Sequence, residues 1–233
     1  TNELEEEICS FGAREIYEGM AYLIEQHITK DFESSPDFPY NTAYKVAEFL
    51  YPILTNDYKN ILVLCDKALM FSNPGSEFVK MIKWIKEIKF VPESPDNLYY
   101  LLEQYWEIYD INVKVDPLDN FKKIAEDVKS NMHIILNDEY FNDYHKWIDT
   151  IIKYAIKIRT HMPLFWIDIV DHGYVKCNNV FQSILHFAGA PLIETNKHEY
   201  HFITPNGCED STCLVYFKVF NQIFRILSMG DLQ

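Results

Sequence analysis

The sequence predicts a mainly α-helical protein, a globular bundle of about eight or nine helices with a small C-terminal β-hairpin. Three observations support this fold class. Apolar residues recur at helical spacing through most of the chain, turn-forming residues separate these runs, and only the tail has short runs rich in aromatic and β-branched residues. With 233 residues, 48% of them hydrophobic, the chain can bury a core without disulfides or a metal.

Five helices are expected in the first half, each ending where Pro, Gly, Asn or Asp interrupts the apolar periodicity. Their ranges are 3–29, from about 41 to a break at 56–57, 61–71, from the turn SNPGSE at 72–77 to about 90, and 95–110. The fifth begins at Ser94-Pro95, a pair typical of an N-cap and the first helical position.

Four further helices are expected after residue 115. Asp116-Pro117 begins a helix that ends near residue 136, and FNDYHKWIDTIIKYAIKIR forms the next one, at 141–159. A short apolar helix starts at Pro163 and is expected to stop at Gly173. The last one, NNVFQSILHFAG, is ended by Gly189.

The tail has a different pattern. HEYHFIT at 198–204 and CLVYFKVF at 213–220 flank PNGCEDST, and Asn206-Gly207 is typical of a turn. These runs predict the two strands of the hairpin. We therefore expect a helical domain at 1–190 and a hairpin-containing extension at 191–233 that packs on it.

The charge balance limits the class of partner. Thirty-five acidic residues against twenty-one basic ones give a net charge of −14, which repels the phosphate backbone of nucleic acids and favours a protein partner with a basic surface. No glycine-rich phosphate loop occurs among the seven glycines. The five cysteines, an odd number, favour a reducing compartment. An acidic N-terminus and the lack of any long apolar segment favour a cytoplasmic protein without membrane contact.

EGMAYLIEQH, residues 18–27, is the first candidate site. At 100° per residue, Glu18 and Glu25 form one narrow polar stripe on an otherwise apolar helix, while His27 falls on the opposite side. Such a stripe either faces solvent or supplies two carboxylates to a metal held with partner helices, although the sequence has no Glu-x-x-His to complete a di-metal site. His27 is expected to be a hydrogen-bonded histidine at the core or its rim.

The tail offers a second candidate metal site. Two nitrogen and two sulfur ligands, His198, His201, Cys208 and Cys213, suit a structural zinc ion. The histidines stand three residues apart instead of four, which excludes the zinc-peptidase helix, and on a regular strand they would face opposite ways. Free thiols beside a loop are the alternative, and no cofactor is expected in that case.

HMPLFWIDIVDHG, residues 161–173, is the last candidate. Asp168 and Asp171 share a helical face near His161 and His172, so the segment forms either an acid–base pocket or a buried aromatic helix with polar ends.

No catalytic motif fixes a reaction, and the catalytic residues stay unknown. The expected function is a non-catalytic acidic protein that acts by protein–protein interaction, as an adaptor, regulator or complex subunit. The alternative is a helical metal-dependent enzyme that uses Glu18 and Glu25.

Overall fold

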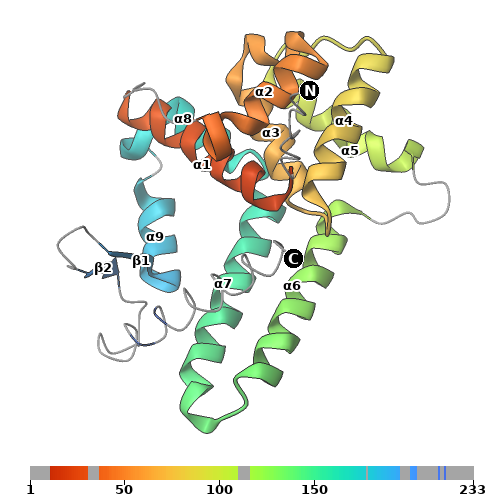
Figure 1. Ribbon diagram of the computed structural model, residues 1–233. Helices are drawn as coiled ribbons and strands as arrows, with labels where there is room; N and C mark the ends of the chain where they lie inside the picture. Colours follow the sequence, from red (N-terminus) through yellow and green to blue (C-terminus); the bar gives the residue numbers. More distant parts are fainter. Residues whose placement is uncertain are drawn as a thin grey trace, which may run out of the picture. The chain divides into compact units, whose positions relative to one another are not determined.

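The computed structural model describes residues 11–30, 37–109, 116–176, 178–194 and 200–203, together with Val215 and Lys218. The mainly helical prediction is confirmed, because the described residues form nine α-helices (Figure 1). They are α1 (Ala13–Thr29), α2 (Thr42–Leu50), α3 (Tyr58–Ala68), α4 (Pro74–Glu87), α5 (Pro95–Tyr109), α6 (Pro117–Ile135), α7 (Asn142–His161), α8 (Phe165–Lys176) and α9 (Asn178–Ala188). One π-helical and two 3-10 segments, Asp37–Asn41, Pro52–Asn56 and Glu139–Phe141, lie between them. Among the described residues, no helix is both long and apolar enough to cross a membrane.

The predicted C-terminal hairpin is wrong. Its second strand was expected at 213–220, but Val215 and Lys218, the residues described there, are helical. The short strand β2 (Tyr200–Ile203) instead pairs antiparallel with β1 (Ala190–Glu194), and the register is irregular between Ala190 and Ile193. A run rich in aromatic and β-branched residues predicts a strand, but which other strand it pairs with depends on the rest of the fold.

The chain divides into two compact units. The first unit contains residues 1–124 and 162–173, and the second contains 125–161 and 174–233, so α6 passes from one to the other. The sequence predicts a different division, into a helical domain at 1–190 and an extension at 191–233, and that boundary stays a prediction.

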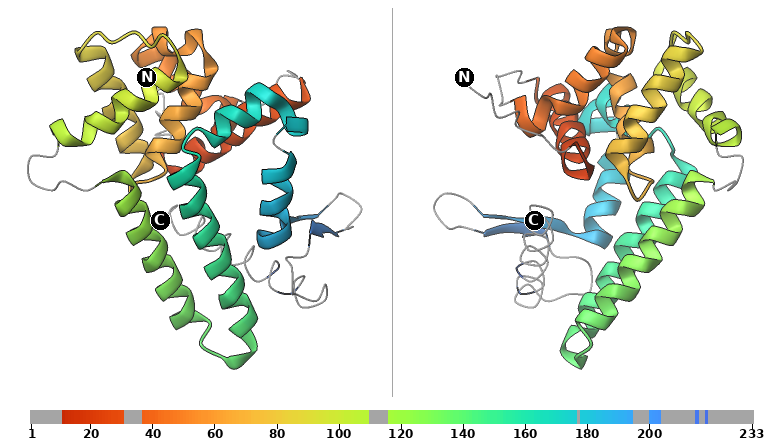
Figure 2. Two further views of the ribbon diagram at one scale, coloured as in Figure 1. Left: turned by 180° about the vertical axis from the view of Figure 1, so that it is seen from behind. Right: turned by 45° about the vertical axis from the view of Figure 1, so that its right-hand side comes forward.

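Helix α3 is the centre of the first unit. Every residue from 60 to 68 is buried, as expected for a helix that is apolar nearly all round. Helices α1, α2, α4 and α5 all contact α3 (Figures 1 and 2). Ile167 of α8 belongs to the same hydrophobic core.

Side-chain caps fix where several helices begin. Asp57, Asn73, Ser94 and Asp116 each accept a hydrogen bond from a backbone N–H two or three residues later, over 2.7–3.3 Å. A proline follows the last three of these caps, as predicted for 94 and 116. The expected end of a helix at Gly173 is wrong, because α8 continues to Lys176.

In the second unit, α7 runs antiparallel to the part of α6 after residue 124 (Figure 2). Lys129 and Asp149 form an ion pair of 3.2 Å between these helices, and the rings of His133 and His145 stack with centroids 3.8 Å apart. Helix α9 also contacts α7, and Phe187 stacks on Tyr154.

Candidate functional site

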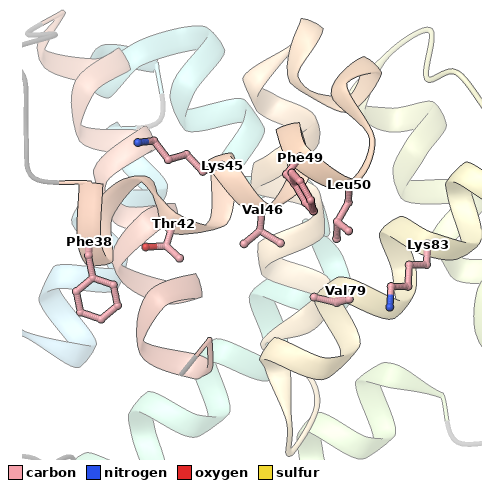
Figure 3. A pocket seen from close by; sticks show the side chains of 8 residues that line it. All are labelled: Phe38, Thr42, Lys45, Val46, Phe49, Leu50, Val79 and Lys83. Atoms are coloured by element: carbon pink, nitrogen blue, oxygen red, sulfur yellow. The ribbon is translucent and has the colours of Figure 1, made fainter. Parts of the chain in front are cut away.

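The first unit has an apolar groove between α2 and α4, with a volume of about 490 Å³ (Figure 3). Its lining residues are Phe38, Thr42, Lys45, Val46, Phe49, Leu50, Val79 and Lys83. This volume is in the range of pockets that accept ligands or partner side chains. Phe49 is 85% exposed and Phe38 is 45% exposed, so large aromatic surface is left in contact with solvent.

Two faces of α2 explain the groove. Ala43 and Ala47, one turn apart, are fully buried against the core. Val46 and Phe49, displaced around the helix, line the groove instead. A nine-residue helix that is apolar on both faces buries one face in its own core and leaves the other uncovered.

Helix α4 supplies the second wall through Val79 and Lys83, which stand four residues apart on one face. Phe78 and Ile82 on its other face are fully buried. Lys83 and Lys45 are exposed, and none of the eight lining residues is acidic. The groove is therefore apolar with a positive rim, on a chain of net charge −14.

The two carboxylates predicted as metal ligands lie on α1. Glu25 is exposed and Glu18 is half-buried. Within the described residues, no group of three or more His, Cys, Asp or Glu side chains is arranged to hold a metal ion. Metal binding by Glu18 and Glu25 stays a prediction.

The buried carboxylate of this helix is Glu15, which accepts a hydrogen bond of 2.8 Å from the Gly12 N–H and so caps the start of α1. The spacing Gly12-x-x-Glu15 is the sequence signal for this cap, and the start of the helix was not predicted from it.

His27 is half-buried near the end of α1. Its Nδ1 lies 2.7 Å from the Leu23 carbonyl oxygen, so Nδ1 carries a proton and donates it. The imidazole stacks on Tyr58, with ring centroids 3.3 Å apart. These contacts give His27 a structural role between α1 and α3.

Asp171, from the candidate segment 161–173, lies beside the same tyrosine. Lys59 donates to Asp171 over 2.6 Å, which ties α8 to the first turn of α3. Burial, and after it the negative charges of Asp171 and Asp57, raise the pKa of Tyr58 to about 12. Two stretches that the sequence analysis considered separately therefore meet at Tyr58.

The cavity beside α8 is too small for a substrate. Trp166 and Ile167, with Asp66 and Tyr99 opposite, enclose a volume of about 10 Å³, which is about one water molecule. None of His161, Asp168, Asp171 and His172 lines this cavity, so the acid–base pocket predicted for the segment stays a prediction. Trp166 of α8 packs against the core of the first unit.

Lys67 is a buried cation that the sequence analysis did not identify. Its side chain is 2% exposed, its Nζ pairs with Glu103 of α5, and it lies 3.8 Å from the centroid of the Tyr99 ring. Burial lowers the pKa of Lys67, while the hydrogen bond and charge of Glu103 oppose that shift. The carboxylate and the π face together stabilise the ammonium group, so this cluster holds α3 against α5.

The tail metal site lies largely outside the described residues. This is the case for His198, Cys208 and Cys213, and only the backbone of His201 is described, in β2. The zinc site stays a prediction.

The raised pKa values predict a loss of stability at alkaline pH. Tyr58 and Tyr144 have pKa values of about 12 in the fold, and burial also raises the pKa of Cys65. Below about pH 9 both states keep these protons, and the Cys65 thiol, whose ordinary pKa is 9.0, is the first group that the unfolded chain deprotonates. Between about pH 10 and 12 the unfolded chain releases them first, so the free energy of unfolding falls, by roughly 2 kcal/mol for the fully buried Tyr144.

Urea denaturation at steps between about pH 9 and pH 12 measures this loss, and the Tyr144→Phe variant should show a shallower decline than the wild type. A free energy of unfolding that stays constant over this range would contradict the prediction.

Comparison with known proteins adds no relationship: no family model matches the sequence, and neither a curated protein nor a solved structure matches the chain.

Proposed function

We propose that this chain is a non-catalytic protein that binds another protein through the groove between α2 and α4. The observation that supports this proposal is the uncovered apolar face of α2, in which Val46 and Phe49 face the groove while Ala43 and Ala47 fill the core. Apolar surface gathered in a groove with a polar rim is typical of protein-binding sites.

Energetic considerations support the same proposal. Covering the Phe49 ring alone would remove a large aromatic side chain from water, and a buried aromatic residue commonly contributes a large share of binding energy at an interface. The groove is lined by helix side chains and holds no carboxylate, histidine or cysteine, so its lining offers contact surface and lacks the usual acid–base and nucleophilic groups.

The charge of the whole chain bears on the partner. A net charge of −14 favours a partner whose wider surface is basic, as the composition suggests. The two lysines of the rim are a local exception to this negative charge.

Site-specific photo-crosslinking in the cells that express the protein tests this function. A photoreactive phenylalanine analogue at position 49 should give a discrete adduct with one partner protein. The same analogue at position 134 should not give that adduct. Ile134 is a matched control because it is 72% exposed and, like Phe49, is the penultimate residue of its helix.

The Phe49→Asp substitution should then abolish co-purification of the partner identified at position 49, while Ile134→Asp should retain it. Because Phe49 is 85% exposed, its replacement should leave the thermal unfolding curve close to that of the wild type. Identical adducts at both positions, or unchanged binding by a folded Phe49→Asp variant, would refute the proposed function.

A further inference from the structure

We infer that the small cavity between α3, α5 and α8 holds one ordered water molecule, and that this water links the Asp66 carboxylate to the first turn of α8. The inference is independent of the proposed function, because no residue that lines the groove also lines this cavity. Three observations support it: the size of the cavity, the buried carboxylate on its wall, and the pattern of polar groups along the contact between α3 and α8.

The cavity has the size of one water molecule. Its volume of about 10 Å³ is far too small for a substrate or an organic cofactor, but it admits a single water. Asp66 of α3, Tyr99 of α5, and Trp166 and Ile167 of α8 stand on its wall, together with aliphatic side chains. All of these residues belong to the first unit, so the cavity lies within one compact part of the chain.

The carboxylate of Asp66 makes this cavity suitable for water. Asp66 is 6% exposed, so bulk solvent hydrates it poorly. A carboxylate has about four acceptor positions for hydrogen bonds, and leaving part of it against an apolar space costs free energy because nothing replaces its hydration. Cavities with purely apolar walls stay without solvent, whereas buried waters occur beside polar groups that need a hydrogen-bond partner. The wall chemistry therefore favours a bound water.

The face of α3 toward α8 has a polar residue at each end. Four residues at i, i+3, i+4 and i+7 share this face: Lys59, Leu62, Val63 and Asp66. At one end, Lys59 donates directly to Asp171 of α8 over 2.6 Å. At the other end, Asp66 shares the cavity with the start of α8. A water in this cavity gives the second end a polar link that corresponds to the ion pair at the first.

The first turn of α8 supplies the hydrogen-bond donors. The N–H groups at the start of a helix have no intrahelical acceptor, and Trp166 and Ile167, in the first turn of α8, both line the cavity. A water that donates to Asp66 and accepts from one of these N–H groups satisfies both sides at once. The partial positive charge at a helix N-terminus also favours a carboxylate near this end of α8.

Water-selective NOE and ROE spectra of the isotope-labelled full chain test the inference. We expect cross-peaks from water to the amide proton of Trp166, Ile167 or both, with opposite signs in the two spectra, which distinguishes a bound water from proton exchange. Among the side chains that line the cavity, Tyr99 has the hydroxyl group that could relay such a signal. The same cross-peaks should therefore remain in the Tyr99→Phe variant.

Two substitutions should remove the water. Val63→Ile adds a methylene group at the wall and should displace it, whereas Val46→Ile, which adds the same group in the groove, should leave the cross-peaks unchanged. Asp66→Leu removes the acceptor and should abolish the cross-peaks. It should also make the exchange of the Ile167 amide with solvent about tenfold faster, as expected for the loss of one hydrogen bond. Asp66→Asn keeps an acceptor oxygen at similar size and is the matched control, which should retain the water.

Each result decides the inference. A folded wild type without water cross-peaks to either amide would overturn it, and so would cross-peaks that disappear in Tyr99→Phe, because they would come from the hydroxyl. Cross-peaks that persist in Asp66→Leu would show that the carboxylate does not hold the water. Should Asp66→Leu fail to fold, Val63→Ile decides: cross-peaks that persist in this variant would place the water outside the cavity.

Discussion

Replacing Lys67 by Ala is expected to lower the free energy of unfolding by about 2–4 kcal/mol. The side chain is 2% exposed, so truncation to Ala leaves a cavity where its aliphatic stem packs in α3. It also removes the ammonium group from Glu103 and from the Tyr99 ring. Glu103 is 45% exposed and regains hydration, so the cavity is the larger part of the expected cost.

Lys67→Met is the matched control, because Met fills nearly the same volume without the charge. A buried ion pair is often no more stabilising than an apolar side chain of the same size, and we expect this variant to lie within about 1 kcal/mol of the wild type. Urea denaturation of both variants measures the difference. A loss as large for Met as for Ala would show that the charge, and not the packing, holds α3 to α5.

The lowered pKa of Lys67 gives the same variants a second readout. A lysine whose pKa is lower in the fold than its usual 10.5 binds more protons in the unfolded chain, so its contribution to stability rises with pH up to about 10.5. The Lys67→Met variant should lack this rise, which precedes the alkaline loss that the tyrosines cause. A slope below pH 10 that is the same in both proteins would contradict the pKa assignment.

Helix positions were largely predictable because their signals are local. Ser94 and Asp116 were identified as starting points from the residue type and the following proline, and both accept the capping hydrogen bond. Gly173 was misread as a stop, since a glycine inside a helix costs only about 1 kcal/mol and packing can outweigh it. The hairpin prediction was wrong because strand pairing is not a local property. The pattern at 198–204 predicts a strand, but it does not indicate that this strand pairs with β1.

The groove could not be predicted, because periodicity shows that a face is apolar but not what covers it. The i, i+3, i+4 spacing of Ala43, Val46 and Ala47 is typical of one apolar face, yet only the two alanines are fully buried, while Val46 also lines the groove. Lys67 had a detectable signal, a single Asp-Lys pair inside the apolar run 61–71, which suggests a helix buried on all sides. Its partner Glu103 is 36 residues away in sequence, and only the packing of α5 on α3 brings the two together.

Replacing Gly75 by Ala is expected to destabilise the fold by about 1–3 kcal/mol, opposite in sign to the effect that helix propensity predicts. Gly75 lies in the first turn of α4, where Ala would normally be favoured by about 1 kcal/mol. Here a Cβ would overlap the Phe11 carbonyl group, meeting its carbon at 2.8 Å, and would lie 3.1 Å from the Gly12 Cα. These are backbone atoms, so they cannot move aside as the end of a flexible side chain would.

The position of Phe11 makes the clash costly to relieve. Its ring packs edge-on against Phe78, with centroids 5.5 Å apart, and Phe78 is fully buried in the core of the first unit. Moving the Phe11 backbone away from α4 would therefore loosen this aromatic contact as well.

Ser76→Ala, in the same helical turn, is the matched control and should change stability by less than about 0.5 kcal/mol. Urea denaturation of both variants measures the effect, and a Gly75→Ala protein more stable than the wild type would show that Phe11 does not lie against α4 in solution.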